Sequence, residues 1–232
     1  MTWVPEAVIF DMDGVLINSE PLWRRAMVKG FGESGMVVSE DECRQTMGMR
    51  IAEVVKLWLH RFNQPASSSD LIELRIMDVL LELIEREGRA LDGVHELLDF
   101  CEAKKLKCGL ATSSSVRLMK AVLARLGLQK KFSATISAER LRYGKPHPEV
   151  FLLCAENLKC HPQKCLVIED SLNGVIAAKA ASMTVIAVPD DDYLHADVLR
   201  QKQFSLADER AEKMADVQGI IRRRYFNENI TA

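Results

Sequence analysis

The feature that most constrains the fold is a repeated alternation of short apolar runs with longer segments of helical periodicity. The apolar runs are continuous, which is typical of strands covered by helices on both faces of a parallel sheet. We predict strands at residues 7–11, 106–112, 132–137, 164–170 and 184–189. Helical patterns follow at residues 93–105, 115–127, 147–159 and 172–183. This repetition predicts an α/β fold, a doubly wound (Rossmann-like) parallel sheet with right-handed crossovers.

The segment from residue 18 to about residue 89 interrupts this rhythm, because it contains no convincing strand pattern. Its helical patterns cover residues 20–31, 39–48, 51–62 and 68–87. Ser68 or Ser69 is suited to the N-cap of the last of these helices. We therefore predict an α-helical cap domain, residues 18–90, inserted into an α/β core domain formed by residues 1–17 and 91–232.

Two aspartates, Asp11 and Asp13, stand one residue apart at the end of the first predicted strand. In an extended chain, residues i and i+2 face the same side, so both carboxylates can point at one spot. Two unit charges about 4 Å apart repel by roughly 4 kcal/mol at an effective dielectric near 20. Such a pair does not stabilise a fold, so we expect a cation beside it or a chemical role for it.

Other polar residues stand at the same edge of the predicted sheet, where doubly wound folds bind ligands. Thr112 ends the second strand and Ser113 follows it, Glu169 and Asp170 end the fourth, and Lys145 lies in a Gly-Lys-Pro turn before a helix. The oxygen ligands, without histidine or thiolate, favour Mg²⁺ over Zn²⁺. With Lys145 and a hydroxyl opposite the ion, the set is suited to binding a phosphoryl group.

Four ordered motifs resemble those of the haloacid dehalogenase superfamily: DMDGV at 11–15, the hydroxyl of Thr112, GKPHPE at 144–149 and EDSLNG at 169–174. The resemblance covers essentially the whole chain. The segments SEPLW, GMRI and VVKLW look closest to bacterial phosphatases of 2-deoxyglucose 6-phosphate and of related hexose or hexitol phosphates, within the β-phosphoglucomutase-like group. The resemblance therefore implies a phosphatase with an α/β core and a helical cap.

The resemblance also implies the catalytic and metal-binding residues. Asp11 would attack phosphorus and form an aspartyl-phosphate intermediate. Asp13 would protonate the leaving alkoxide and later deprotonate water. The Mg²⁺ ligands would be Asp11, the backbone carbonyl of Asp13, Asp170 and Glu169, the last directly or through water.

The phosphate-binding residues implied by the resemblance are Thr112 and Lys145, with Lys145 also restraining Asp11. Ser113 or Ser114 can supply the hydroxyl in place of Thr112, so this position stays open. The partner is then a small-molecule phosphate monoester.

Two cap residues bear on the substrate. A sugar phosphomutase of the β-phosphoglucomutase type shares the core motifs and carries a cap histidine where this chain has Trp23. An indole cannot shuttle a proton, so Trp23 favours hydrolysis of hexose or hexitol 6-phosphates over phosphomutase activity. Arg50 lies where caps of the family often contact substrate. A catalytically silent phosphate-binding protein is the non-enzymatic alternative.

Bulk properties exclude several other classes of protein. The net charge of −2 over 232 residues argues against a nucleic-acid partner. No apolar run approaches the ~20 residues that a membrane span requires. The N-terminal stretch becomes acidic at once and does not have the pattern of a secretory signal. We therefore expect a cytoplasmic protein, and a monomer.

Overall fold

The computed structural model describes residues 3–46, 49–189 and 203–228. Within these ranges its centre is a six-stranded, all-parallel sheet with the strand order β3-β2-β1-β4-β5-β6. The strands are β1 (Ala7–Phe10), β2 (Lys107–Thr112), β3 (Ala134–Ser137), β4 (Cys165–Glu169), β5 (Thr184–Ala187) and β6 (Glu209–Arg210). This order and the helical insertion described below confirm the predicted doubly wound fold.

Strand β1 lies at the centre of the sheet because all four of its residues are apolar and fully buried. Phe10 is paired with Leu110 of β2 on one side and with Ile168 of β4 on the other. The chain leaves β1 toward β2 and β3, and later returns to β4 on the opposite side. The direction of winding therefore reverses at β1, which places a ligand-binding crevice at the carboxyl end of this strand.

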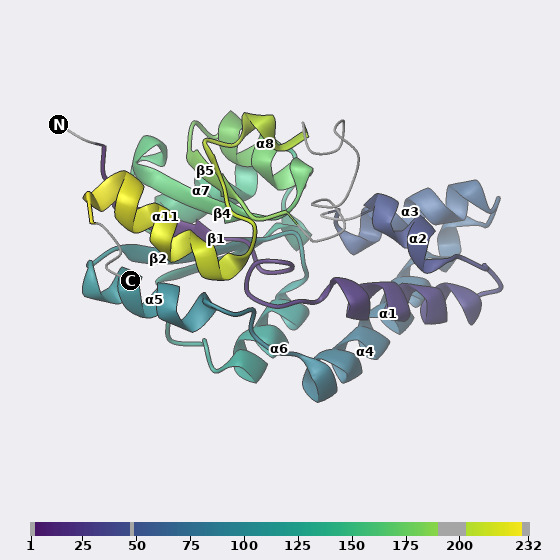
Figure 1. Cartoon of the computed structure of the whole chain (residues 1–232). Coiled ribbons are helices and arrows are strands. Elements are labelled where there is room, and N and C mark those ends of the chain that lie inside the picture. The colour runs from purple at the N-terminus through teal and green to yellow at the C-terminus, as the bar shows by residue number, and fades with distance from the viewer. Residues whose placement is uncertain (1–2, 47–48, 190–202, 229–232) are drawn as a thin grey trace.

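Helices cover both faces of the sheet (Figure 1). They are α5 (Val94–Ala103), α6 (Val116–Leu126), α7 (Glu149–Asn157), α8 (Leu172–Ala180) and α11 (Met214–Phe226). Val8 and Phe10 pack into one apolar cluster with residues of α5, α6 and α11, whereas Ala7 and Ile9 pack into a second with α7 and α8. Because alternate residues of β1 enter opposite clusters, the strand must be apolar throughout, as its sequence is.

The insertion between β1 and β2 is helical. It contains α1 (Glu20–Gly32), α2 (Glu40–Cys43), α3 (Ile51–Arg61) and α4 (Ser69–Glu87), with short 3₁₀ turns at Arg44–Thr46 and Ala66–Ser68. α1 and α4 pack along each other and form, with α2 and α3, a group beside the sheet (Figure 1). Ile17 and Ala90 form an isolated antiparallel bridge, so the chain enters and leaves the insertion at adjacent points.

Two elements of the structure were not predicted, namely β6 and α11. β6 has two polar residues, Glu209 and Arg210, and pairs with β5 at Ile186 and Ala187. α11 completes the face that α5 covers, and its Tyr225 packs edge-on against Trp3. In the part of the chain that the structure describes, no helix combines the length and apolar character needed to cross a bilayer.

Candidate active site

The predicted site residues gather at a cavity between the carboxyl ends of the strands and the helical insertion. The cavity encloses about 580 Å³, including its open mouth. Its core wall consists of Asp11, Asp13, Thr112, Ser113, Ser114, Lys145, Glu169, Asp170 and Ser171. Its cap wall consists of Glu20, Trp23, Met27, Cys43, Thr46, Met49, Ile51 and Val54. Of the predicted site residues, Arg50 alone is absent from this lining.

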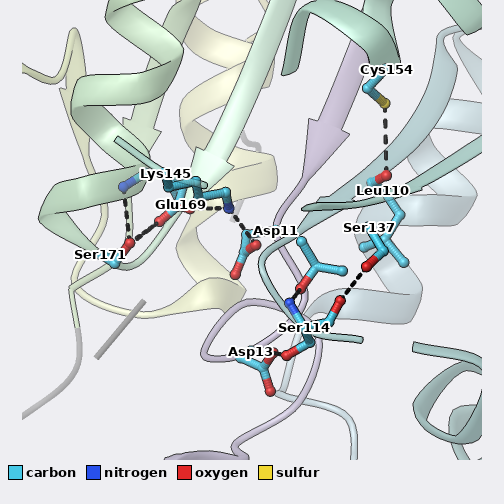
Figure 2. A network of polar contacts seen from close by, with 11 residues as sticks. Asp11, Asp13, Leu110, Ser114, Ser137, Lys145, Cys154, Glu169 and Ser171 are labelled. Carbon is cyan, nitrogen blue, oxygen red and sulfur yellow. Dashed lines mark hydrogen bonds and ion pairs between the residues drawn. The ribbon is translucent and has the colours of Figure 1, made fainter. Parts of the chain in front are cut away.

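Lys145 forms the centre of the core wall. Its ammonium nitrogen lies 2.6 Å from Asp11 Oδ1 and 2.5 Å from Glu169 Oε1, as Figure 2 shows. Burial alone would lower the pKa of Lys145, but the Asp11 and Glu169 carboxylates outweigh burial and raise it. Lys145 is therefore charged and fixes the orientation of Asp11 through a bond shorter than a neutral hydrogen bond.

Glu169 is held on both carboxylate oxygens. Oε1 accepts from Lys145, whereas Oε2 accepts from the Ser171 backbone N–H at 2.7 Å and from its hydroxyl at 3.0 Å. Ser171 is also the N-cap of α8, because its Oγ accepts from the backbone N–H of Gly174 at 3.0 Å. The start of α8 therefore anchors Glu169, and Glu169 anchors Lys145.

Asp11, Glu169 and Asp170 form a buried acidic cluster in which one oxygen of each lies within 4.8 Å of the others. Burial, with repulsion from Glu169 and Asp13, raises the pKa of Asp11 to about 7 against the attraction of Lys145. Burial and the neighbouring Glu169 and Asp11 carboxylates raise the pKa of Asp170 well above its ordinary range. The cluster therefore resists full ionisation unless another cation is added.

The cluster suits a Mg²⁺ ion in charge and in ligand chemistry. Three ionised carboxylates beside the Lys145 ammonium leave two uncompensated negative charges, and the oxygens are hard ligands. Both Glu169 oxygens already accept hydrogen bonds from Lys145 and Ser171. Asp11 and Asp170 are accordingly the residues best placed to hold the ion, with Glu169 beside them.

Two glycines make room for the two acidic side chains. Gly14 adopts φ +73°, and a Cβ on it would lie 2.0 Å from Asp170 Oδ2. A Cβ at Gly174 would lie 1.7 Å from Glu169 Oε1. Gly14, from the DMDGV motif, thus makes room for the carboxylate of Asp170. Gly174 makes room for the carboxylate of Glu169, which belongs to the same EDSLNG motif as Gly174.

Three hydroxyls stand at the end of β2 and in the loop after it, on Thr112, Ser113 and Ser114. Thr112 Oγ1 accepts from the Ser114 backbone N–H at 3.0 Å, which leaves its own O–H available to donate. Ser113 Oγ is buried and, within the described ranges, has no hydrogen-bond partner. Both residues line the cavity, which also contains the Lys145 ammonium group. The unpartnered Ser113 hydroxyl is therefore available to donate to a bound anion.

Asp13 lies apart from the acidic cluster and accepts three hydrogen bonds. Oδ1 accepts from Ser19 Oγ at 2.5 Å and from Trp23 Nε1 at 3.0 Å, whereas Oδ2 accepts from Ser114 Oγ at 2.6 Å. Figure 2 shows Asp13 beside Ser114, on the opposite side of Asp11 from Glu169. The two aspartates of the first motif therefore have different partners, although they are one residue apart.

The structure places Arg50 outside the cavity lining. Its guanidinium pairs with Glu53 in the cap and donates to the core carbonyls of Leu141 at 2.9 Å and Ala138 at 3.3 Å. Here Arg50 links the start of α3 to the loop that leads to Lys145. A role for Arg50 in substrate binding stays a prediction.

Two serines, Ser19 and Ser171, were not predicted to support the site, and Ser114, predicted as an alternative phosphate-binding hydroxyl, contacts Asp13. Ser19 and Ser114 donate to Asp13, and Ser171 donates to Glu169. Ser171 stands between the Glu-Asp pair and a helical pattern, so the N-cap preference could have identified it. Ser19 also precedes a helix, but its hydroxyl contacts Asp13 and makes no capping bond.

Fold and site together define the class: a doubly wound α/β enzyme whose buried aspartate, lysine and acidic cluster face a cavity under a helical insertion. The chain belongs to the haloacid dehalogenase-like hydrolase family, whose model matches residues 5–182. This match confirms the predicted family, and the relatives described next support its assignment as a phosphatase.

Two curated relatives and one solved structure are similar over most of the chain. Hexitol phosphatase B of Escherichia coli K12 is 39% identical over 214 residues, covering 91% of this chain and 93% of that protein. A phosphorylated carbohydrates phosphatase of Thermotoga maritima is 35% identical, covering 77% and 82%. The crystal structure of β-phosphoglucomutase from Clostridium difficile has a TM-score of 0.83 at 24% identity, covering 97% and 98%. This last likeness shows the fold.

Proposed function

We propose that the protein is a Mg²⁺-dependent phosphatase that hydrolyses small sugar phosphates, namely hexose or hexitol 6-phosphates, through an aspartyl-phosphate intermediate on Asp11. The observation that carries this proposal is the buried Asp11, held by Lys145 at 2.6 Å in a cavity that Asp13 also lines. The similarity to a hexitol phosphatase and to a phosphorylated carbohydrates phosphatase supports sugar phosphates as the substrate class.

The first step transfers the phosphoryl group to Asp11. A carboxylate oxygen of Asp11 forms a bond to phosphorus while the bond from phosphorus to the sugar oxygen breaks. Asp13 gives its proton to that oxygen, so the sugar leaves as an alcohol. In the second step Asp13, now ionised, removes a proton from a water molecule that attacks phosphorus, which releases inorganic phosphate and restores Asp11.

The remaining residues of the core wall bind and orient the phosphoryl group. Lys145 offsets its negative charge while holding Asp11, and the hydroxyls of Ser113 and Thr112 donate to its oxygens. Asp11, Asp170 and the backbone carbonyl of Asp13 would hold Mg²⁺, with Glu169 as a ligand directly or through water. When bound, the ion supplies additional positive charge to the transferring group. Catalysis of this kind consists largely of positioning and electrostatic stabilisation.

Trp23 favours hydrolysis over the phosphomutase alternative. A phosphomutase must return the phosphoryl group to a second oxygen of the same sugar, whereas a phosphatase must admit water. The indole of Trp23 lines the cavity and carries a donor that cannot accept a proton. A silent phosphate-binding role would not require the second aspartate beside Asp11.

A panel of sugar phosphates, assayed separately for inorganic phosphate and for isomerised sugar, tests this proposal. We expect Mg²⁺-dependent phosphate release from hexose or hexitol 6-phosphates, loss of release in EDTA, and no isomer. Conversion of glucose 1-phosphate to glucose 6-phosphate without phosphate release would identify a phosphomutase. Binding of phosphate with no turnover of any ester would identify the silent alternative.

We also infer that the enzyme acts as a cytoplasmic monomer on a small-molecule phosphate monoester, without a nucleic-acid or membrane partner. Sedimentation equilibrium measures the mass in solution, and 26.1 kDa is the value expected for one chain. A mass of twice this value would contradict the monomer.

A further inference from the structure

We propose that Trp23 is a positioning residue for Asp13: its indole N–H, bonded to Oδ1, holds the carboxyl group so that Oδ2 is the oxygen directed at the loop after β2 and at the leaving group. This inference rests on the proposed function, in which Asp13 is the general acid. It assigns to Trp23 a role in the reaction besides that of a wall against the substrate.

The contacts of Asp13 distinguish its two oxygens. Oδ1 accepts from Ser19 Oγ at 2.5 Å and from Trp23 Nε1 at 3.0 Å, and Oδ2 accepts from Ser114 Oγ at 2.6 Å. A serine hydroxyl can donate or accept, so Ser19 and Ser114 can adapt to either protonation state. An indole N–H can only donate. Oδ1 already accepts two hydrogen bonds, one of them from a group that can only donate, whereas the hydroxyl beside Oδ2 can turn and accept, so the contacts favour a proton on Oδ2.

The position of Oδ2 agrees with its role as the acidic oxygen. Ser114, its partner, belongs to the loop that follows β2 and lines the cavity together with Thr112 and Ser113. Figure 2 shows the Asp13 carboxyl group directed at this loop. When Oδ2 carries a proton, the Ser114 hydroxyl can turn and accept from it until a substrate oxygen takes its place. Trp23 thus directs the proton toward the side of Asp13 on which phosphate binds.

The first turn of α1 is built around this carboxyl group. Ser19 occupies the N-cap of the helix but makes no side-chain capping bond, and its hydroxyl donates to Asp13. A lost N-cap bond costs about 1 kcal/mol in a typical helix. Trp23 lies four residues later and therefore on the same face of α1. Two donors from one helical turn thus converge on one oxygen.

The leaving group provides a test, because the need for a proton depends on its basicity. A sugar alkoxide is strongly basic and needs the proton from Asp13, whereas a nitrophenolate leaves without one. If Trp23 positions the proton, removing its N–H will slow esters of basic leaving groups and spare esters of weakly basic ones. If Trp23 is a wall, all members of a series of similar shape will change by the same factor.

The experiment measures kcat/KM for phenyl phosphates with graded ring substituents and for an alkyl phosphate, in wild type and in variants. kcat/KM reports the steps up to formation of the aspartyl-phosphate and is independent of its hydrolysis. Trp23→Phe removes the N–H and keeps an aromatic ring. Benzothienylalanine at position 23 removes the N–H and keeps the bicyclic shape, so it tests the point even where Trp23→Phe fails to fold.

Trp58→Phe is the matched control. Trp58 is a second cap tryptophan, and its Nε1 is buried with no hydrogen-bond partner within the described part of the chain. It does not line the cavity. Trp58→Phe should therefore change kcat/KM by the same small factor for every ester. Asp13→Asn serves as the reference for complete loss of the acid.

In wild type we expect kcat/KM to depend only weakly on leaving-group basicity. Asp13→Asn should lose about 10²- to 10⁴-fold on the alkyl ester. Both position-23 variants should lose about 10-fold on that ester, the equivalent of about 1.4 kcal/mol, and much less on 4-nitrophenyl phosphate. If kcat/KM of a position-23 variant depends on leaving-group basicity as in wild type, while that of Asp13→Asn depends on it steeply, this inference alone is overturned. Wild-type dependence in Asp13→Asn overturns Asp13 as the acid, and with it the proposed mechanism.

Discussion

The two walls of the cavity differ in how their side chains are held. On the core wall, Asp11, Lys145 and Glu169 are buried and hydrogen-bonded to one another, and Ser171 holds the last of them. The cap wall is mainly apolar: Trp23, Met27, Cys43, Met49, Ile51 and Val54, with Glu20 and Thr46. A wall of mutually bonded charges tolerates little change, whereas the mainly apolar cap wall, Trp23 excepted, discriminates between substrates mostly by shape. The core wall is therefore suited to fixed chemistry and the cap wall to variable specificity.

The largest effect that would sharpen this comparison is expected from Asp11→Asn. The amide is similar in size to the carboxylate but is not a nucleophile, so turnover should fall by more than about 10³-fold. Phosphate release by the repurified variant measures the loss. The exposed Asp99, which pairs with Lys131 at the surface, gives the matched control Asp99→Asn with wild-type turnover. Activity near wild type in Asp11→Asn would rule out the covalent intermediate.

The second prediction concerns pH and Mg²⁺. Asp11 has a pKa of about 7 in the folded protein and an ordinary value of 3.8, so the folded state binds its proton more tightly. Its contribution to stability is thus present at low pH and is lost as pH rises from about 4 to 7. If Mg²⁺ binds the ionised cluster as proposed, it should stabilise the fold by about 3 kcal/mol at pH 8 when present at ~100-fold its Kd at that pH, and by less at pH 5.

Urea unfolding with EDTA and with Mg²⁺ at both pH values measures this difference. In Asp170→Asn, one buried negative charge is removed, so the metal-free variant should be more stable than wild type at pH 8. The increase in the free energy of unfolding on adding Mg²⁺ should be smaller in this variant than in wild type. An unchanged Mg²⁺ gain in Asp170→Asn would exclude Asp170 as a ligand.

A third, smaller effect concerns the link between the two walls. Arg50→Ala removes hydrogen bonds from a guanidinium to the carbonyls of Ala138 and Leu141, and the free energy of unfolding should fall by about 1–3 kcal/mol. The exposed Arg86, paired with Glu87, gives the control Arg86→Ala with a loss of about 0–1 kcal/mol. A raised KM for sugar phosphates without loss of stability would show instead that Arg50 binds substrate.

The smallest effect is expected on the cap wall itself. Ile51→Val removes one methylene from the cavity lining, so the ratio of kcat/KM for six-carbon and four-carbon sugar phosphates should change by about 3- to 10-fold. Activity on phenyl phosphate should stay near wild type. Ile220→Val, in α11 and outside the cavity lining, is the control with no change in selectivity. A uniform loss on all esters from Ile51→Val would contradict the division between the walls.

The sequence predicted best those parts whose physical cause is local. The residues of β1 are buried on both faces, so the strand is a continuous apolar run that is visible without the fold. β6 is two polar residues that become a strand only because the edge of β5 is present to pair with them. α11 was not predicted as an element, because the charged run from Arg222 to Arg224 interrupts the helical pattern of apolar positions that pack on α5.

The candidate site divides in the same way. Asp11, Lys145 and Asp170 follow strands or a tight turn, so topology brings them together once the sheet is known. The direction of Arg50 depends on carbonyls 88 and 91 residues away in the chain, which no local pattern reveals. From the sequence alone, Trp23 is known only as a side chain that cannot accept a proton, whereas in the structure its N–H donates to Asp13.

Gly14 and Asp170 come from motifs more than 150 residues apart, yet they share one small volume, because a Cβ at position 14 would lie 2.0 Å from Asp170 Oδ2. Substitutions at these positions should therefore show strong epistasis. Because φ is +73° at position 14, few residues besides glycine fit there, chiefly Asn and Asp, and in a library randomised at both positions these should survive selection for folding only with a shorter residue at position 170. Selection for phosphate release should then remove these pairs, because they lack the carboxylate. The two motifs can change independently elsewhere, but at this contact the residue at each position limits which residues the other position allows.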